Sequence, residues 1–326
     1  MKSITSPAVA GITRCIVLLL GIFAVMQPVQ AQYPDKTVRI IVPFAPGAQT
    51  DAIARVVANG LSKQLGKTFL VENRPGAGGL IGTDAVIKSD PDGYTLLFTG
   101  GAALFPLFVK EATFDPRIAF SPISTVYELP FALIVTASIP ANTLAEFISV
   151  VKASPKKYNH ASASLSYDFL YLEMLRADNQ LDTVHILYKG GAPMYQALLT
   201  GEVHYGLGAA SAAAPMVKDG KVRVLAVTGE ERHALFPQAP TFGELRARDI
   251  RSPKVGLLAP ANVPRDIVAR LNQAVVTTMQ SPDVREPIMK IGNVVSTSTA
   301  EEFSRAIADE YVRFSAITKA AGIKPQ

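Results

Sequence analysis

The chain has 326 residues, of which 32 are basic and 27 acidic, and its formal net charge is +5. This surplus is small and no run of like charges stands out, which argues against a nucleic-acid-binding protein. A hydrophobic fraction of 48% can supply a large core, and the length predicts about two domains. Cys15 is the one cysteine, so disulfides and cysteine-based metal or nucleophile sites are not expected.

The first residues have the pattern of a secretory signal. Lys2 and Arg14 flank a short positive region, an apolar run extends from Cys15 to Met26, and Val29-Gln30-Ala31 places small residues where signal peptidase reads them. The run of about twelve residues is shorter than the roughly twenty of a spanning helix, which argues against an uncleaved anchor. Residues 1–31 are therefore predicted to be a cleaved signal peptide, and the mature protein is expected in the periplasm.

Strands and helices alternate in the first part of the mature chain. A short apolar strand is followed by a Gly/Pro turn and a helix-period segment, and this unit then repeats. The expected elements are a strand at Val38 to Val42, a helix from Asp51 to Leu65, a strand at Phe69 to Glu72, a helix at Leu80 to Lys88 and a strand at Tyr94 to Phe98. Such alternation predicts a mainly parallel sheet covered by helices.

The pattern restarts in the middle of the chain. Phe131 to Val135 is typical of a strand, and the capping box Thr143-Leu144-Ala145-Glu146 predicts a helix that ends before Pro155. Further strands are expected at Val184 to Tyr188, Val203 to Leu207 and Val222 to Val227, separated by helices that end at Gly201 and Gly220. These elements predict a second α/β domain.

Helices dominate the last part of the chain. After a strand at Lys254 to Leu258, helices are expected at Pro264 to Met279, from Pro282, and from the capping box Thr299-Ala300-Glu301-Glu302 to Gly322. The last of these has apolar residues on one face, so we expect it to pack on a domain.

Residues that carry catalysis are sparse. The histidines His160, His185, His204 and His233 are widely spaced and show no metal-ligand pattern. No G-x-S-x-G or H-E-x-x-H motif is present, and the S-x-x-K spacings lack the elements that accompany them in serine hydrolases. The glycine-rich segment Gly76 to Gly82 fails the dinucleotide spacing because Ile81 stands where glycine is required. An exported enzyme is therefore not expected.

Several loops can instead present backbone N–H groups to an anion. Helices open near Thr50, Ser166 and Ala192, and helix N-termini attract negative charge. In an open α/β sheet these loops fall at the carboxyl ends of the strands, where ligand crevices form. The pattern predicts an anion-binding crevice.

Long motifs in a fixed order carry a family resemblance. The sequence resembles the tripartite tricarboxylate transporter receptor family, also called the Bug family, over essentially the whole mature chain. The segments that carry it are Val42 to Gly47 with Asp51 and Arg55, Val71 to Gly79, Pro91 to Leu97, Val184 to Pro193, Gly220 to Thr228, Gly256 to Pro260 and Ala320 to Pro325.

The resemblance implies an α/β, type II periplasmic-binding-protein fold, with two α/β domains, a hinge of two crossing strands and a ligand cleft between the domains. The crossings are expected near Ser121 to Ile134 and near Lys254 to Leu258. Residues 32–130 with 254–326 would then form domain 1, and residues 131–253 domain 2.

The resemblance also implies a receptor that captures a small organic carboxylate and delivers it to a two-component membrane permease of the tripartite type. A receptor that reports its ligand to a membrane sensor kinase is the alternative. No cofactor and no metal is implied, and the protein is expected to be a monomer. The ligand contacts that the resemblance implies are Phe44, Ala45, Gly47, Ala48, Gly101, Ala102, Ala161, Ser162, Ser164, Ser166, Tyr188 and Gly191.

The sequence departs from the family pattern where the ligand is expected. Ala48 stands where a second glycine is usual, Phe105 where an asparagine is usual, and Gly208-Ala209 where an Asp-Asn pair is usual. A buried amine or hydroxyl without a partner costs about 1 to 3 kcal/mol, so loss of the Asp-Asn pair argues against amino-acid ligands.

The segment Ala161 to Asp168 likewise has fewer glycines than the family pattern and adds Leu165 and Tyr167. The resulting hypothesis is a carboxylate with a larger apolar or aromatic body, stacked near Phe44, Phe105 or Tyr167.

Overall fold

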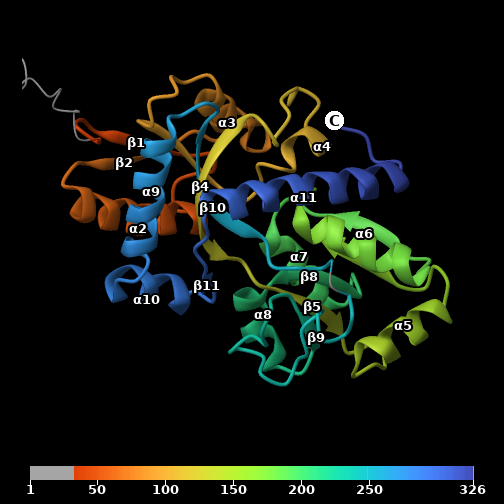
Figure 1. Ribbon diagram of the computed structural model, residues 1–326. Helices are drawn as coiled ribbons and strands as arrows, with labels where there is room; N and C mark the ends of the chain where they lie inside the picture. The colour runs from red at the N-terminus through yellow and green to blue at the C-terminus, as the bar shows by residue number, and fades with distance from the viewer. Residues whose placement is uncertain (1–32, 248, 326) are drawn as a thin grey trace, which may run out of the picture. The chain divides into compact units, whose positions relative to one another are not determined.

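A computed structural model describes residues 33–247 and 249–325, and the chain from Lys36 onward forms one unit (Figure 1). The predicted signal peptide lies outside the described residues. In the described part of the chain, no helix is long and apolar enough to cross a membrane.

The first sheet is built from two separated stretches of the chain. Its strand order is β11-β4-β10-β3-β1-β2. The strands are β1 (Val38–Val42), β2 (Phe69–Asn73), β3 (Thr95–Thr99), β4 (Phe120–Glu128), β10 (Lys254–Pro260) and β11 (Val294–Val295). β1 runs parallel to β2 and β3, whereas β10 is antiparallel to both of its neighbours, β3 and β4.

The second sheet has the order β7-β6-β8-β5-β9. Its strands are β5 (Phe131–Thr136), β6 (Asn159–Ser162), β7 (Val184–Leu187), β8 (Tyr205–Ala209) and β9 (Val222–Val227). β6 is parallel to β7 and β8, and β5 is antiparallel to β8 and β9. The second sheet therefore repeats the plan of the first, because β5 is inserted antiparallel between β8 and β9 as β10 is inserted antiparallel between β3 and β4.

The inserted strands connect the two sheets. β5 follows β4 after only Leu129 and Pro130, and β10 is the first strand after the chain leaves β9. Each inserted strand thus enters its sheet directly after the chain has crossed from the other one. This arrangement confirms the predicted fold class, while the domain boundaries at residues 130 and 253 stay a prediction.

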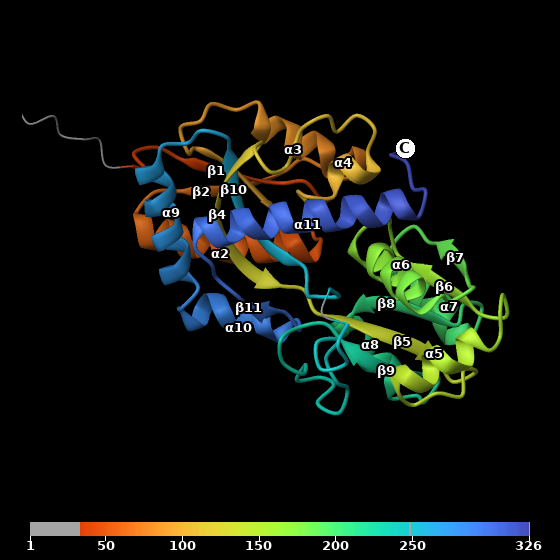
Figure 2. The same cartoon turned by 45° about the vertical axis from the view of Figure 1, so that its right-hand side comes forward.

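Helices cover both faces of the first sheet (Figures 1 and 2). They are α2 (Gln49–Leu65), α3 (Leu80–Ile87), α9 (Arg265–Thr278), α10 (Pro282–Lys290) and α11 (Ala300–Ala320). Ile41 and Leu97 pack against Val86 of α3 and Phe303 of α11. The alternate strand residues face α2 and α9, because successive side chains of a strand point to opposite faces.

The second sheet is also covered on both faces. Its helices are α5 (Leu144–Lys152), α6 (Tyr167–Asn179), α7 (Gly191–Thr200) and α8 (Ala210–Val217). Leu133 packs in one cluster with Phe147 of α5, and its neighbour Ile134 packs in another with Met194 of α7. α11 continues past the first sheet to contact α6, and Figure 2 shows it running along both groups of elements.

Two local features differ from the sequence expectations. β6 was not predicted because its residues, Asn159–Ser162, are mostly polar, yet His160 is fully buried there. The capping box at Thr299 is complete, but at Thr143 only half of it forms. There the Glu146 carboxylate accepts from the N–H of Asn142, one residue before the cap.

Candidate ligand-binding site

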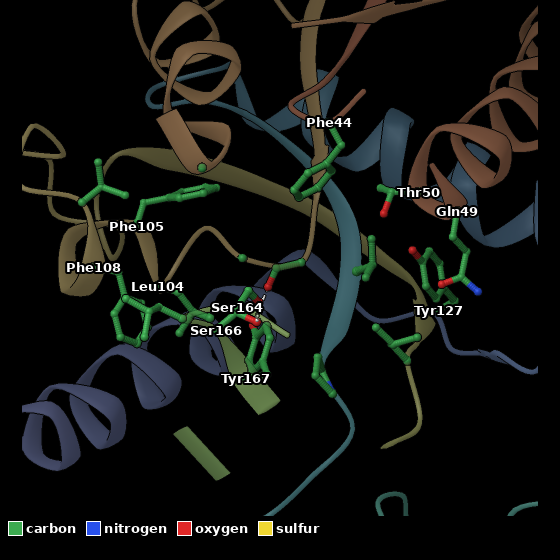
Figure 3. Close-up of a pocket in the computed structure, with 18 residues that line it drawn as sticks. Phe44, Gln49, Thr50, Leu104, Phe105, Phe108, Tyr127, Ser164, Ser166 and Tyr167 are labelled. Carbon is green, nitrogen blue, oxygen red and sulfur yellow. Dashed lines mark hydrogen bonds between the residues drawn. The ribbon is translucent and has the colours of Figure 1, made fainter. Parts of the chain in front are cut away.

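A cavity of about 530 Å³ lies at the carboxyl ends of β1, β3 and β6 and against the crossing strands β4 and β10 (Figure 3). This is where an open α/β sheet places its ligand crevice. The lining residues are Phe44, Gln49, Thr50, Gly78, Gly100, Gly101, Leu104, Phe105, Phe108, Val109, Tyr127, Leu129, Ser164, Leu165, Ser166, Tyr167, Pro253 and Val255. None of these described residues carries a formal charge at neutral pH.

One wall of the pocket is apolar. Leu104, Phe105 and Phe108 lie together in and before the short helix α4 (Phe105–Phe108) on one side of the view in Figure 3, and the ring of Phe44 enters from above. Phe108 is fixed from behind by Phe169 of α6, with ring centroids 6.1 Å apart at an interplanar angle of 66°. This wall suits an apolar or aromatic group.

Polar groups lie on the opposite side in Figure 3. Gln49 and Thr50 open α2, and Thr50 shares a hydrogen bond with the hydroxyl of Tyr127 in β4. Burial raises the pKa of Tyr127 to about 12. Tyr127 is therefore a neutral hydroxyl at physiological pH, suited to hydrogen bonding.

The loop after β1 is held in place by Asp51. The Asp51 carboxylate accepts from the Gly47 N–H at 2.9 Å and from the side-chain amide of Asn73 at 2.9 Å, and Arg55 lies 3.0 Å away. The same Asn73 amide group donates to the carbonyl of Phe44. Burial acts to raise the pKa of Asp51, but these hydrogen bonds outweigh it and hold the pKa below its usual value.

Asp168 has the equivalent role in the loop after β6. Its carboxylate accepts from the Ala163 N–H at 2.6 Å and from the Ser166 hydroxyl at 2.9 Å. Ser164 in turn donates to Ser166 at 2.9 Å. Ser164 can turn its hydroxyl hydrogen toward a ligand, because the loop is still held by the hydrogen bond from Ser166 to Asp168. Burial raises the pKa of Asp168.

The floor of the pocket is formed by Tyr167. Its hydroxyl lies within hydrogen-bond distance of the Gly100 carbonyl oxygen and 2.9 Å from Oε2 of Glu310 in α11. Burial raises the pKa of Tyr167 well above its usual value, so this hydroxyl is neutral. Tyr167 therefore joins an element of the second sheet to two elements of the first.

The predicted site residues divide into two groups. Four of them line the cavity: Phe44, Gly101, Ser164 and Ser166. The others lie outside its lining: Ala45, Gly47, Ala48, Ala102, Ala161, Ser162, Tyr188 and Gly191. Their part in binding stays a prediction.

Several of the predicted residues outside the lining are buried or make other contacts. Ser162 is buried in β6, with its hydroxyl 2.8 Å from Nε2 of His185, and Ala161 is buried beside it. The hydroxyl of Tyr188 donates to Glu202 at 2.8 Å. Ala102 is 3% exposed and borders a small void beside Glu310 instead of the main cavity.

Sequence reasoning missed several lining residues. Gln49, Tyr127 and Val255 were not named, although Tyr127 and Val255 lie in the segments that were expected to form the hinge of crossing strands. The alternation of side chains was the available signal, because the lining residues Tyr127 and Leu129, and likewise Pro253 and Val255, are two positions apart and so lie on one face of an extended segment.

The departure at Gly208 has a steric cause. A Cβ atom there would lie 2.6 Å from the hydroxyl oxygen of Tyr195, and the same oxygen accepts from the Ala209 N–H at 3.0 Å. Tyr195 therefore occupies the space beside β8 that a side chain at residue 208 would need. Burial raises the pKa of Tyr195 to about 12, so it too is neutral.

No group of three histidine, cysteine, aspartate or glutamate residues that could hold a metal ion occurs within residues 33–325 as described. The two sheets with exchanged strands, and the uncharged cavity at their carboxyl ends, define a solute-binding protein of the type II class. A family profile described as tripartite tricarboxylate transporter family receptor matches residues 53–323, and the chain belongs to this family.

Relatives agree with this assignment. Protein BugT from Bordetella pertussis is 33% identical over 322 residues, covering 95% of this chain and 98% of BugT. The solved periplasmic binding protein BugD is 29% identical with a TM-score of 0.71, covering 90% of this chain and 100% of BugD. The family is thus one of solute-binding receptors that includes periplasmic proteins.

Two similar structures contain carboxylates. A Rhodopseudomonas palustris protein solved with adipate is 30% identical, with a TM-score of 0.73, covering 90% of this chain and 100% of that protein. MatC from the same organism, solved with malate, is 30% identical, with a TM-score of 0.69, covering 87% of this chain and 99% of MatC.

Proposed function

We propose that the protein is a periplasmic receptor that captures a small organic carboxylate with an apolar or aromatic body and delivers it to a two-component membrane permease of the tripartite type. The observation that carries the ligand class is the uncharged cavity of about 530 Å³ with a phenylalanine-rich wall. Its size is that of a small-molecule site. Adipate and malate in similar proteins support the carboxylate.

The pocket offers different surroundings to the two ends of such a ligand. A carboxylate would take hydrogen bonds from Thr50, Ser164 and the backbone N–H groups at the start of α2, which carry the positive end of the helix dipole. The ligand body would lie against Phe44 and Phe105. A second or third carboxylate would have to be buried against this wall without a partner, which is costly.

Binding itself would be the function. A ligand that contacts both groups of elements favours the conformation in which they close around it, by its differential affinity for that conformation. The permease would then recognise the closed form. Among the lining residues, no acid or base is positioned for catalysis. The ligand would therefore be transported without being chemically changed.

A thermal-shift screen of the mature protein tests this function. Benzoate and phenylacetate should raise the melting temperature more than citrate or malate, because only the first two place an apolar surface on the Phe105 wall without burying a second carboxylate there. A ligand at a hundredfold excess over its Kd stabilises the folded state by about 2.7 kcal/mol, which gives a clear shift. A preference for citrate, or for neutral sugars over all acids, would contradict the proposal.

The variant Phe105→Asn sharpens this test. It should lower the ratio of benzoate to malate affinity by about tenfold, because a buried aromatic contact is lost and a polar partner is gained. The ratio is measured by calorimetry on one folded sample, so a general loss of stability does not affect it. Ile118→Asn is the matched control, since Ile118 is 74% exposed and lies outside the lining.

A further inference from the structure

The hydroxyl of Tyr167 stands between two oxygen atoms. One is the carbonyl oxygen of Gly100, just after β3, and the other is Oε2 of Glu310, 2.9 Å away on α11. The ring is fixed by Tyr171 and Phe314, with centroid distances of 6.0 and 5.8 Å. The hydroxyl is therefore held at a junction of elements from both sheets, next to the ligand pocket.

Counting hydrogens shows what this junction requires. The Gly100 carbonyl can only accept, and the Tyr167 hydroxyl has a single hydrogen to donate. With an ionised Glu310, two acceptors compete for that hydrogen and one contact is left as an oxygen–oxygen repulsion. A neutral Glu310 supplies a second hydrogen, so that Glu310 donates to Tyr167 and Tyr167 donates to Gly100.

The surroundings of Glu310 act on its pKa in opposite directions. Burial is the largest influence and raises the pKa of Glu310 to about 7, while the hydrogen bond with Tyr167 and the charges of Arg313, Lys254 and Arg251 act to lower it. These cations lie on α11, on β10 and in the segment before β10, and the groups that face Glu310 from α6 are the neutral Tyr167 and Tyr171.

Two of these cations, Lys254 and Arg313, have other carboxylate neighbours. Lys254 lies 3.8 Å from Glu128, and Arg313 lies 3.8 Å from Asp249. Among the described residues, neither forms an ion pair with Glu310 within 4.0 Å. The hydroxyl of Tyr167 is thus a direct hydrogen-bond partner of the Glu310 carboxyl group.

We propose that Glu310 is a positioning residue and carries a proton in this structure. The hydrogen-bond chain Glu310–Tyr167–Gly100 fixes the pocket wall, so carboxylate binding weakens when Glu310 ionises. The inference rests on the proposed function for its effect on the ligand, but the protonated chain itself does not need a ligand. Ionisation of Glu310 weakens carboxylate binding in two ways. It breaks the hydrogen-bond chain, and it places a negative charge near an anionic ligand.

The protonation state is measured without any ligand. Difference infrared spectra of the wild type minus Glu310→Gln should show the C=O stretch of a protonated carboxylic acid at about pH 5.5, lost at about pH 8.5. In Tyr167→Phe this band should shift, because the carboxylic acid loses its hydrogen-bond acceptor. A difference spectrum with only carboxylate bands at both pH values overturns the proposal.

The effect on binding is measured by calorimetry with benzoate, adipate and malate, using whichever of the three binds most tightly. Benzoate is ionised across the range, so its own titration contributes nothing. The second carboxyl groups of adipate and malate titrate at about pH 5, so for these two ligands the titration of the free acid is measured separately and its contribution is subtracted. Wild-type affinity should fall roughly tenfold from about pH 5.5 to about pH 8.5, the upper range for one net hydrogen bond. Glu310→Gln should bind equally at both pH values, and Asp309→Asn, an exposed acid next in sequence, should behave as the wild type.

Tyr167→Phe separates the hydrogen-bond chain from charge alone. It should bind weakly at both pH values and keep only the part of the pH dependence that comes from the charge of Glu310, since Glu310 then has no connection to Gly100. Full wild-type pH dependence in this variant, or a pH-independent wild type, would overturn the positioning role. If none of the three acids binds, the proposed function fails, while the infrared result still decides the protonation of Glu310.

Discussion

Asp51 and Asp168 shape the pocket from outside its lining. Each follows a parallel strand near the start of a helix, and each accepts a backbone N–H from the loop that it closes. Removing such a carboxylate leaves buried donors without partners, which costs more than the hydrogen bonds contribute when formed. The pair explains how uncharged loops can hold a defined shape around a ligand.

Asp51→Asn should lower the free energy of unfolding by about 2 kcal/mol at neutral pH, because the Gly47 N–H and Arg55 lose an ionised acceptor. The folded-state pKa of Asp51 is lowered, so its contribution is present above the unfolded value of 3.8 and is lost as the pH falls through the folded-state pKa. Urea unfolding of both proteins at neutral and acid pH measures this difference.

Asp283→Asn is the control for that measurement, since Asp283 is 83% exposed and lies 3.9 Å from the exposed Lys63. It should change stability by less than about 0.5 kcal/mol. An Asp51→Asn protein as stable as this control at neutral pH would show that the loop does not depend on the carboxylate.

Individual residues also show how far the sequence could predict the site. Phe44 was named because it lies in a segment that matches the family pattern, and Phe105 because it stands at a departure from that pattern. The chain from Ser164 through Ser166 to Asp168 was not predictable, since three hydroxyl and carboxyl groups in one loop can pair in several ways. Glu310 lies 143 residues from Tyr167, and no local pattern connects them.

At the scale of elements, β10 is closely packed against its neighbours around Gly256. A Cβ atom on Gly256 would lie 2.3 Å from the Ser124 carbonyl oxygen and 2.7 Å from a ring carbon of Phe303. The register between β10 and β4 shifts next to this glycine. Gly256 therefore lets β4 and α11 approach the crossing strand together.

Gly256→Ala should destabilise the protein by about 3 kcal/mol, because backbone atoms of β4 and not only a flexible side chain would have to move. Chemical denaturation monitored by circular dichroism measures the loss. Gly243→Ala is the matched control, as the nearest atom to its added Cβ would be at an ordinary 3.5 Å. If Gly256→Ala and Gly243→Ala were equally stable, the movement of β4 would cost no free energy, and the prediction would be wrong.

Most elements were predictable, but their order in the sheets was not. Apolar runs such as Val38 to Val42 and capping residues such as Thr299 identify strands and helices locally. The pairing of β10 with β3 and β4 depends on contacts across more than a hundred residues, which composition and periodicity do not encode. The family resemblance, and not the local pattern, supplied the expectation of crossing strands.

For the whole molecule, the chain passes between the sheets at residues 129–130 and again at residues 228–253. Rotation about these two connections is the motion that such a topology permits. Saturation with a bound acid should therefore decrease the radius of gyration in small-angle X-ray scattering. An unchanged radius, with calorimetry proving saturation, would mean that the ligand enters a cleft already in its final form.

The strand exchange also has a consequence for the order in which the protein is made. β4 has β10 and β11 as its neighbours, so one of its edges stays unpaired until the chain has extended past residue 260 and the other until it has passed residue 295. Closing loops of this length is slow, and long-range strand pairing delays folding. A nascent chain of this design stays incompletely folded during most of its synthesis, which is compatible with the export predicted from the signal pattern of residues 1–31.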